Sequence, residues 1–272
     1  MAQKKIVSAG PDTSTKQTPE GRPRFEASPE AKKKALTYRL IAVALWVVAI
    51  AAEAFTIFWL LKHTELNNFM VWLIVAIVVI AIFALGGSLL WKKANRFDPA
   101  SERNKVKFFV QNQLGAIITI VAFLPLIILI FANKDMKGNQ KLIAGIIAIV
   151  ALLGVGAASI DYNPPSIEQI DEDAATVIAY TGKNEVFWVK GGSVYHLCAE
   201  NPPGTTIPAL ARGDLDKNPV ISGTVAQAVA DNKTRLSMYG FSECGLTEGE
   251  PKFADLVPST QPTSLDPSDT PS

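Results

Sequence analysis

Four residues in this sequence could do chemistry at a defined position: one carboxyl inside an apolar run, one histidine and two cysteines. The carboxyl is Glu53, in the middle of the apolar stretch 40–61. An ionisable side chain is costly inside a membrane, so it normally faces a helix bundle and marks a proton or cation site. The alternative is a protonated carboxyl that makes one interhelical hydrogen bond. No other ionisable residue occupies the middle of an apolar run to pair with it.

The histidine and the cysteines, His196, Cys198 and Cys244, lie in one short C-terminal region. Histidine nitrogen and cysteine thiolate are common ligands of structural zinc, which takes four ligands. A zinc site here would need a fourth ligand, and Glu243 is a nearby carboxylate. The two cysteines are the only ones in the chain, so a disulfide is the alternative in an oxidising compartment.

Residues 186–244 resemble a short His/Cys module that is similar to the metal-binding part of Ada-type repair proteins. The matching stretches are, in order, Gly191-Gly192, Tyr195-His196, Ile221 to Ala228 and Lys233 to Leu236. In that module a cysteine follows the histidine by four residues, and a Cys-x-x-Cys pair closes the pattern. Here Cys198 comes two residues early and Cys244 stands alone. The resemblance therefore implies at most three zinc ligands from histidine and cysteine.

Four apolar runs predict an α-helical membrane domain at residues 38–160. The expected spans are about 40–61, 69–90, 110–132 and 142–160. The helical period places five residues on one face of the first span: Ala42, Trp46, Ala49, Glu53 and Thr56. Small residues on that face would let a neighbouring helix approach closely. Gly154 and Ala158 form a similar small pair in the fourth span, which is compatible with a homo-oligomer.

Basic residues beside the spans predict their orientation, because Lys and Arg accumulate on the cytoplasmic side. The chain through Arg39 contains nine of them and the 91–107 loop contains six, whereas the two hairpin links contain one and three. The six in the loop are Lys92, Lys93, Arg96, Arg103, Lys105 and Lys107. We expect the protein to lie in the plasma membrane. Four spans then place both of its termini in the cytoplasm. We expect free thiols at the two cysteines in that compartment.

The rest of the sequence predicts one folded module between two disordered ends. Residues 1–37 are basic and poor in large apolar side chains, and residues 250–272 are rich in Pro, Ser, Thr and Asp. Residues 161–249 are expected to form a small α+β module. Its expected elements are a strand at 174–180, a hairpin at 185–197 around Gly191-Gly192, a strand at 220–224, a helix at 225–231 and a strand at 233–239.

No pattern in the sequence indicates an enzyme, because nucleophile elbows, Walker motifs and paired-histidine metal motifs are missing. The acidic part from residue 161 onward would repel phosphates, so nucleic acid is not an expected partner. The chain resembles uncharacterised multi-pass bacterial membrane proteins. We expect an accessory or scaffolding protein whose module binds another membrane or soluble protein, and the alternative is a small transporter that uses Glu53.

Overall fold

The computed structural model divides the chain into two units. It describes residues 5–9, 15–17, 23–211 and 218–257. The helical unit comprises residues 27–168, and the α/β unit comprises residues 1–26 together with 169–272. The α/β unit is therefore built from both ends of the chain.

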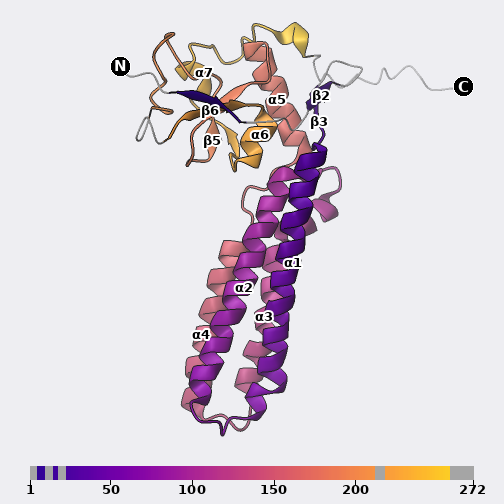
Figure 1. The fold of residues 1–272 in the computed structure, drawn as a ribbon, viewed down its shortest axis with the longest axis vertical. Helices are drawn as coiled ribbons and strands as arrows, with labels where there is room; N and C mark the ends of the chain where they lie inside the picture. Colours follow the sequence, from indigo (N-terminus) through magenta and orange to yellow (C-terminus); the bar gives the residue numbers. More distant parts are fainter. Residues whose placement is uncertain (1–4, 10–14, 18–22, 212–217, 258–272) are drawn as a thin grey trace, which may run out of the picture. The chain divides into compact units, whose positions relative to one another are not determined.

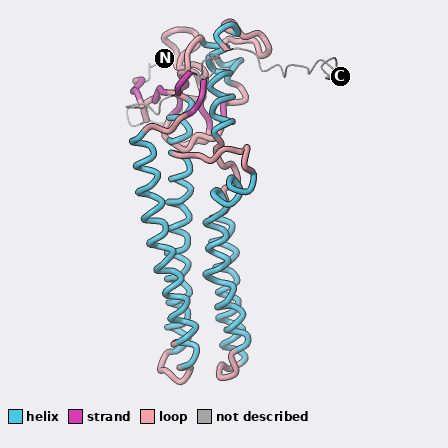
Figure 2. The backbone as a smooth tube through the Cα atoms, turned by 90° about the vertical axis from the view of Figure 1, so that its right-hand side faces the viewer, coloured by secondary structure: helices cyan, strands magenta, loops and turns pink. Residues whose placement is uncertain are grey.

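Four long helices run side by side in the helical unit (Figure 1). They are α1 (Pro29–Phe58), α2 (Phe69–Phe97), α3 (Lys105–Ala132) and α4 (Gly138–Ser159), with a short 3-10 helix, η1 (Leu60–Lys62), after α1. All four are long and apolar enough to cross a membrane, which confirms the number of apolar helices expected. Figure 2 shows the links α1–α2 and α3–α4 at the same end of this bundle.

The helices extend beyond the apolar runs at their basic ends. Asn104 caps α3, since its side chain accepts a hydrogen bond from the backbone N–H of Lys107 at 3.0 Å. Lys, Arg and Ala near the end of α2 are good helix formers, so that helix continues to Phe97. The segment 91–107 is therefore mostly helical, with only residues 98–104 between the helices, which corrects the expectation of a long loop.

The interior of the bundle is mostly apolar and depends on glycine at three close contacts, of which Gly115 against Ser88 is one. A methyl group at Gly87 would lie 2.4 Å from the indole Nε1 of Trp46, and one at Gly145 would lie 2.2 Å from the ring of Phe131. By contrast, a methyl group at Gly154 would meet nothing within 4 Å. The small pair that includes Gly154 does not pack inside this unit, and its role in self-association stays a prediction.

The α/β unit contains a three-stranded sheet with the strand order β1-β6-β4. Strand β1 (Ile6–Ser8) lies parallel to β6 (Val220–Gly223), and β4 (Val186–Trp188) lies antiparallel to β6. The N-terminal segment therefore supplies an edge strand, and α1 begins at Pro29, so the expectation of disorder at residues 1–37 does not hold for these parts; residues 1–4, 10–14 and 18–22 lie outside the described residues. The prediction failed because backbone pairing to a distant strand orders a segment that has too little apolar surface to fold alone.

The remaining elements are β2 (Thr15–Gln17), β3 (Pro23–Phe25), α5 (Ile167–Thr181), β5 (Val194–Tyr195), α6 (Val225–Ala230), β7 (Arg235–Leu236), α7 (Gly240–Glu243) and a 3-10 helix, η2 (Ala254–Leu256). They include two further two-stranded sheets, β2-β3 and β5-β7. Residues 174–180, expected as a strand, belong to α5. The buried Ile170, Ala174 and Val177 recur every three or four residues, which is a helical period.

The expected hairpin around Gly191-Gly192 is present in a shortened form. Phe187 and His196 exchange both backbone hydrogen bonds, at 2.9 and 2.8 Å. Strand β5, however, pairs in parallel with β7, which contains only two residues of the strand expected at 233–239. The two glycines adopt positive φ angles of 84° and 71°, which are strained for other residues.

The expected strand-to-helix unit at 220–231 is confirmed by β6 and α6. Thr224 caps the helix: its hydroxyl accepts from the Gln227 N–H at 3.3 Å, and the Gln227 side chain accepts from the Thr224 N–H at 2.8 Å. Residues 250–272 were expected to be disordered. This needs a correction for the first part of that range, because the Phe253 N–H donates to the Ala179 carbonyl of α5 at 2.8 Å. Residues 258–272 lie outside the described residues.

Candidate functional site

Glu53 lies on the buried face of α1, and only 5% of its surface is exposed. The other four residues expected on that face are buried too, which confirms the predicted face. Its carboxyl group interacts with the backbone N–H of Leu126 in α3, the residue after Pro125. The atom Oε1 has no hydrogen-bond partner, and no cationic side chain forms an ion pair with Glu53, among the described residues.

Neighbouring polar groups on α1 are already engaged in the helices. The Thr56 hydroxyl donates to the Ala52 carbonyl at 2.7 Å, and the Trp46 indole N–H donates to the Ala84 carbonyl at 3.3 Å. Glu53 is therefore a buried carboxyl group with one unpaired acceptor atom, beside polar side chains whose own hydrogen bonds are made. Such a group can hold a proton or a cation.

Two of the expected topology-determining residues join α2 to the end of α4. The Arg96 guanidinium lies 3.1 Å from the Asp161 carboxylate, and both side chains are buried. The Lys92 ammonium donates to the carbonyls of Ala158 and Ile160, each at 2.7 Å. Cations at a helix C-terminus satisfy carbonyls that have no partner within the helix. Lys92 and Arg96 therefore have a structural role that charge counting did not predict.

The other four expected topology-determining residues, Lys93, Arg103, Lys105 and Lys107, are exposed. Lys93 lies over an aromatic ring of α1, and Arg103 lies 3.6 Å from the Glu168 carboxylate. No ion pair joins Lys105 or Lys107 to a described residue.

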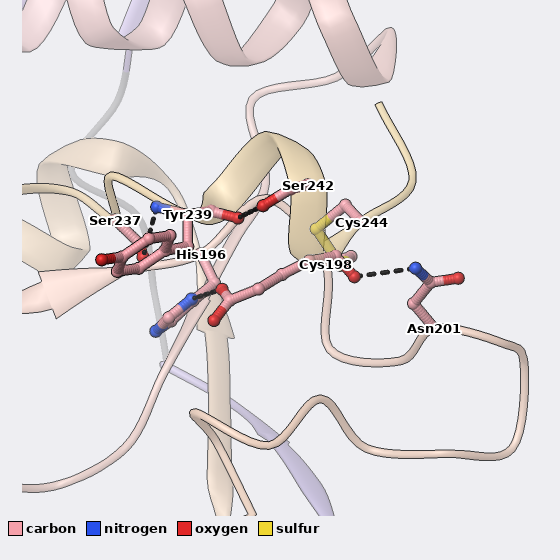
Figure 3. The surroundings of a disulfide bond; sticks show 8 residues. His196, Cys198, Asn201, Ser237, Tyr239, Ser242 and Cys244 are labelled. Carbon is pink, nitrogen blue, oxygen red and sulfur yellow. Dashed lines mark hydrogen bonds and ion pairs between the residues drawn. A yellow bond between two sulfur atoms is a disulfide. The ribbon is translucent and has the colours of Figure 1, made fainter. Parts of the chain in front are cut away.

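His196, Cys198 and Cys244 lie close together in the α/β unit, but they do not form a metal site (Figure 3). The two cysteines form a disulfide, with their Cα atoms 5.8 Å apart. The structure therefore contradicts the expectation of free thiols, and neither sulfur is available as a ligand. His196 is buried, and its Nδ1 lies 2.9 Å from the Glu243 carboxylate.

The zinc alternative has no support from this arrangement. Among the described residues, no group of three or more His, Cys, Asp and Glu side chains could hold a metal ion. The sequence could not distinguish these outcomes, because a disulfide and a shared metal both bring two cysteines together. Glu243, the carboxylate expected as a possible fourth zinc ligand, instead contacts His196.

An exposed turn between β7 and α7 lies beside this pair. Met238 and Tyr239 are 77% and 70% exposed. The backbone around them is held on both sides: the Ser237 N–H donates to the Tyr195 carbonyl, and the Glu243 N–H donates to the Tyr239 carbonyl, both at 2.8 Å. Sequence reasoning missed this turn because it assigned residues 233–239 to one strand. The signal was two large apolar side chains between Ser and Gly.

Buried polar groups hold the strands that carry the turn. The Tyr195 hydroxyl donates to the Asp173 carboxylate of α5. Burial raises the pKa of Asp173 above its usual range, and the hydrogen bond from Tyr195 only partly offsets this. Burial, with the nearby Asp173 charge, also raises the pKa of Tyr195.

Lys233 fixes the Gly191-Gly192 turn. Its ammonium group donates to the carbonyls of Val189, Gly191 and Gly192 at 2.9, 3.0 and 3.1 Å. The side chain is buried, and burial lowers the pKa of Lys233. This contact is a structural clamp, since every donor faces a backbone carbonyl.

No protein-family model, curated protein or solved structure matches this chain. Its function is therefore inferred from the side chains and their surroundings.

Proposed function

We propose that the protein is an integral plasma-membrane protein of accessory or scaffolding type, anchored by α1 to α4, whose α/β unit binds a protein partner. The observation that carries the proposal is the exposed Met238–Tyr239 turn. Aromatic residues and methionine are enriched in protein interfaces. A backbone that is already held in place loses less entropy on binding, so such a turn suits recognition.

The proposal includes both termini on one side of the membrane. Because β1 and β6 belong to one sheet, the chain leaves the α/β unit after residue 26 and returns to it at residue 169. Four crossings meet this requirement, since an even number brings the chain back to its starting side. The basic flanks favour the cytoplasmic side. The Cys198–Cys244 disulfide is more typical of an oxidising compartment, so the side of the membrane needs a direct test.

Photocrosslinking in intact cells tests the binding role. We expect full-length protein with a photoreactive phenylalanine analogue in place of Tyr239 to give one crosslinked product of defined mass. The matched control carries the same analogue at Arg235, which is also exposed and lies in β7. Equal products from both positions, or none from position 239, would refute the proposal.

The energetic contribution of the turn gives a second measurement. Truncating an interface aromatic residue typically costs about 2 kcal/mol, or roughly 30-fold in affinity. Tyr239→Ala is therefore expected to weaken binding of the partner identified by crosslinking about 30-fold, as measured with the full-length protein. An unchanged affinity would show that the crosslink reports proximity alone.

A second candidate function is ion translocation, favoured by the buried Oε1 of Glu53, which has no partner among the described residues. Under this alternative, Glu53→Gln abolishes proton or cation flux in proteoliposomes and leaves crosslinking from position 239 intact. Thr56→Val is the matched control, because it removes a buried polar group from the same face. Flux that survives Glu53→Gln would exclude the alternative.

A further inference from the structure

Two lysines flank a stacked aromatic pair where α1 begins and α2 ends. Tyr38 of α1 and Phe97 of α2 have ring centroids 5.9 Å apart and ring planes inclined by 11°. The Lys93 ammonium lies 4.9 Å from the Tyr38 centroid, and the Lys34 ammonium lies 6.0 Å from the Phe97 centroid. Each lysine therefore lies over a ring of the other helix, and the two cations are held beside one aromatic pair.

These two charges are not neutralised by the protein around them. Among the described residues, no carboxylate forms an ion pair with Lys34 or Lys93. Asp98, which follows α2 directly, is already engaged: the Arg39 guanidinium donates to its carboxylate at 2.8 Å and to its carbonyl at 3.0 Å. Like charges held near each other repel, so an anion bound beside both would be favoured.

Exposed apolar side chains continue from the lysines toward the middle of the bundle. On α1, helical periodicity places Ile41 and Val48 on the same side as Lys34, about two and four turns further along. On α2, it places Leu89 and Ile82 on the same side as Lys93, about one and three turns back. In the order named, these four residues have exposed fractions of 45%, 43%, 51% and 62%. The surface is cationic at its outer end and apolar along its length.

We propose that the lysine–aromatic surface, defined as Lys34, Tyr38, Lys93 and Phe97, binds the headgroup of an anionic phospholipid. The inference rests on the proposed membrane insertion of α1 to α4. The lipid phosphate lies beside the two ammonium groups, where the Tyr38 hydroxyl can donate a further hydrogen bond. The acyl chains follow the exposed apolar residues.

The same geometry selects against zwitterionic lipids. A zwitterionic headgroup carries its own cation, which Lys34 and Lys93 repel. The phosphate of an anionic headgroup has no such internal partner, so it can interact with the two lysines. Aromatic residues at this depth also suit the headgroup region. A preference for anionic over zwitterionic lipid is therefore the measurable property of the surface.

Lipid retention by the full-length protein tests this site. The wild type and the Lys34→Gln/Lys93→Gln variant are purified in a mild nonionic detergent and supplied with phosphatidylglycerol and phosphatidylcholine. Native mass spectrometry then counts the lipids bound. We expect the wild type to prefer phosphatidylglycerol and the double variant to bind it about 30-fold more weakly, at about 1 kcal/mol for each lysine.

The matched control is Lys105→Gln/Lys107→Gln, which removes the same charge from exposed lysines at the start of α3. It is expected to keep the wild-type preference. Equal losses in both double variants would show diffuse attraction and overturn the site, as would no loss in Lys34→Gln/Lys93→Gln. Failure of membrane insertion is separately visible, because alkaline carbonate would then release the protein from membranes without detergent.

Discussion

At the residue scale, the α/β unit depends on buried polar groups whose partners come from distant parts of the chain. Tyr195 of β5 donates to Asp173 of α5, and Lys233 donates to three carbonyls around Gly191-Gly192. A buried polar group that loses its partner costs about 1–3 kcal/mol. These contacts therefore specify how the short strands pack, although the strands themselves have few ladder hydrogen bonds.

The raised pKa of Asp173 gives a pH-dependent prediction at this scale. At pH values between the ordinary aspartate pKa of 3.8 and the raised pKa of Asp173 in the folded state, the folded state binds more protons than the unfolded state. The stability of the α/β unit should therefore fall as pH rises through this window. Asp173→Asn cannot ionise and keeps an acceptor for Tyr195, so its stability should change less with pH. Hydrogen exchange of the β4 and β6 amides at several pH values measures this, and an identical slope in both proteins would contradict it.

At the element scale, two restraints hold the short elements of the α/β unit. Strand β1 pairs with β6, and the disulfide links the end of α7 to the chain after β5. Strand β1 adds to the β6 edge, with hydrogen bonds from the Val220 N–H to the Lys5 carbonyl at 3.1 Å and from the Ala9 N–H to the Ser222 carbonyl at 2.8 Å. Its side chains are exposed, so backbone bonds hold it more than apolar burial does.

Deletion of residues 1–9 tests the contribution of β1. The deletion removes backbone hydrogen bonds worth about 1 kcal/mol each from one edge of β6. We expect amide exchange in β6 to accelerate about tenfold or more, while exchange in α1 to α4 stays unchanged. Hydrogen-exchange mass spectrometry distinguishes these regions. Unchanged exchange in β6 would show that β1 does not stabilise the sheet.

Removal of the disulfide tests the other restraint. Cys198 and Cys244 are separated by 46 positions in the sequence. A cross-link that closes a loop of this size restricts the unfolded chain and contributes about 4 kcal/mol in the chain-entropy model. Cys198→Ala/Cys244→Ala should lower the stability of the oxidised α/β unit by about that amount, measured by hydrogen exchange. Treatment of the wild type with a reductant should give the same loss, and the variant should not respond to reductant.

At the scale of the whole molecule, chain connectivity limits the topology. Both ends of the chain contribute to the α/β unit, so an odd number of membrane crossings is incompatible with its sheet. Charge and cysteine chemistry then favour different sides. The exposed Lys93, Lys105 and Lys107 favour the cytoplasm, whereas a stable disulfide is typical of an oxidising compartment.

Thiol labelling of intact and permeabilised cells tests the topology. We expect a membrane-impermeant thiol reagent to label Cys198 and Cys244 only after permeabilisation, once their disulfide has been reduced. Tags on the two termini should become accessible under the same condition. Labelling in intact cells that needs prior reduction would establish the opposite orientation, and tags on opposite sides would refute the even number of crossings.

The sequence by itself determined the local features of this protein. Apolar runs of sufficient length specify the four helices, and the helical period identifies the buried face that carries Glu53. Both signals depend on residues that are close together in the chain. The Gly191-Gly192 turn was predictable for the same reason.

Only the tertiary structure decided which distant groups meet. The β1–β6 pairing, the Arg96–Asp161 ion pair and the Cys198–Cys244 bond join residues that no local pattern relates. Residues 174–180 are β-prone, yet they form a helix because their buried face packs with a helical period. Local composition could not determine these outcomes, since the free energy of each contact depends on a partner that folding brings from elsewhere in the chain.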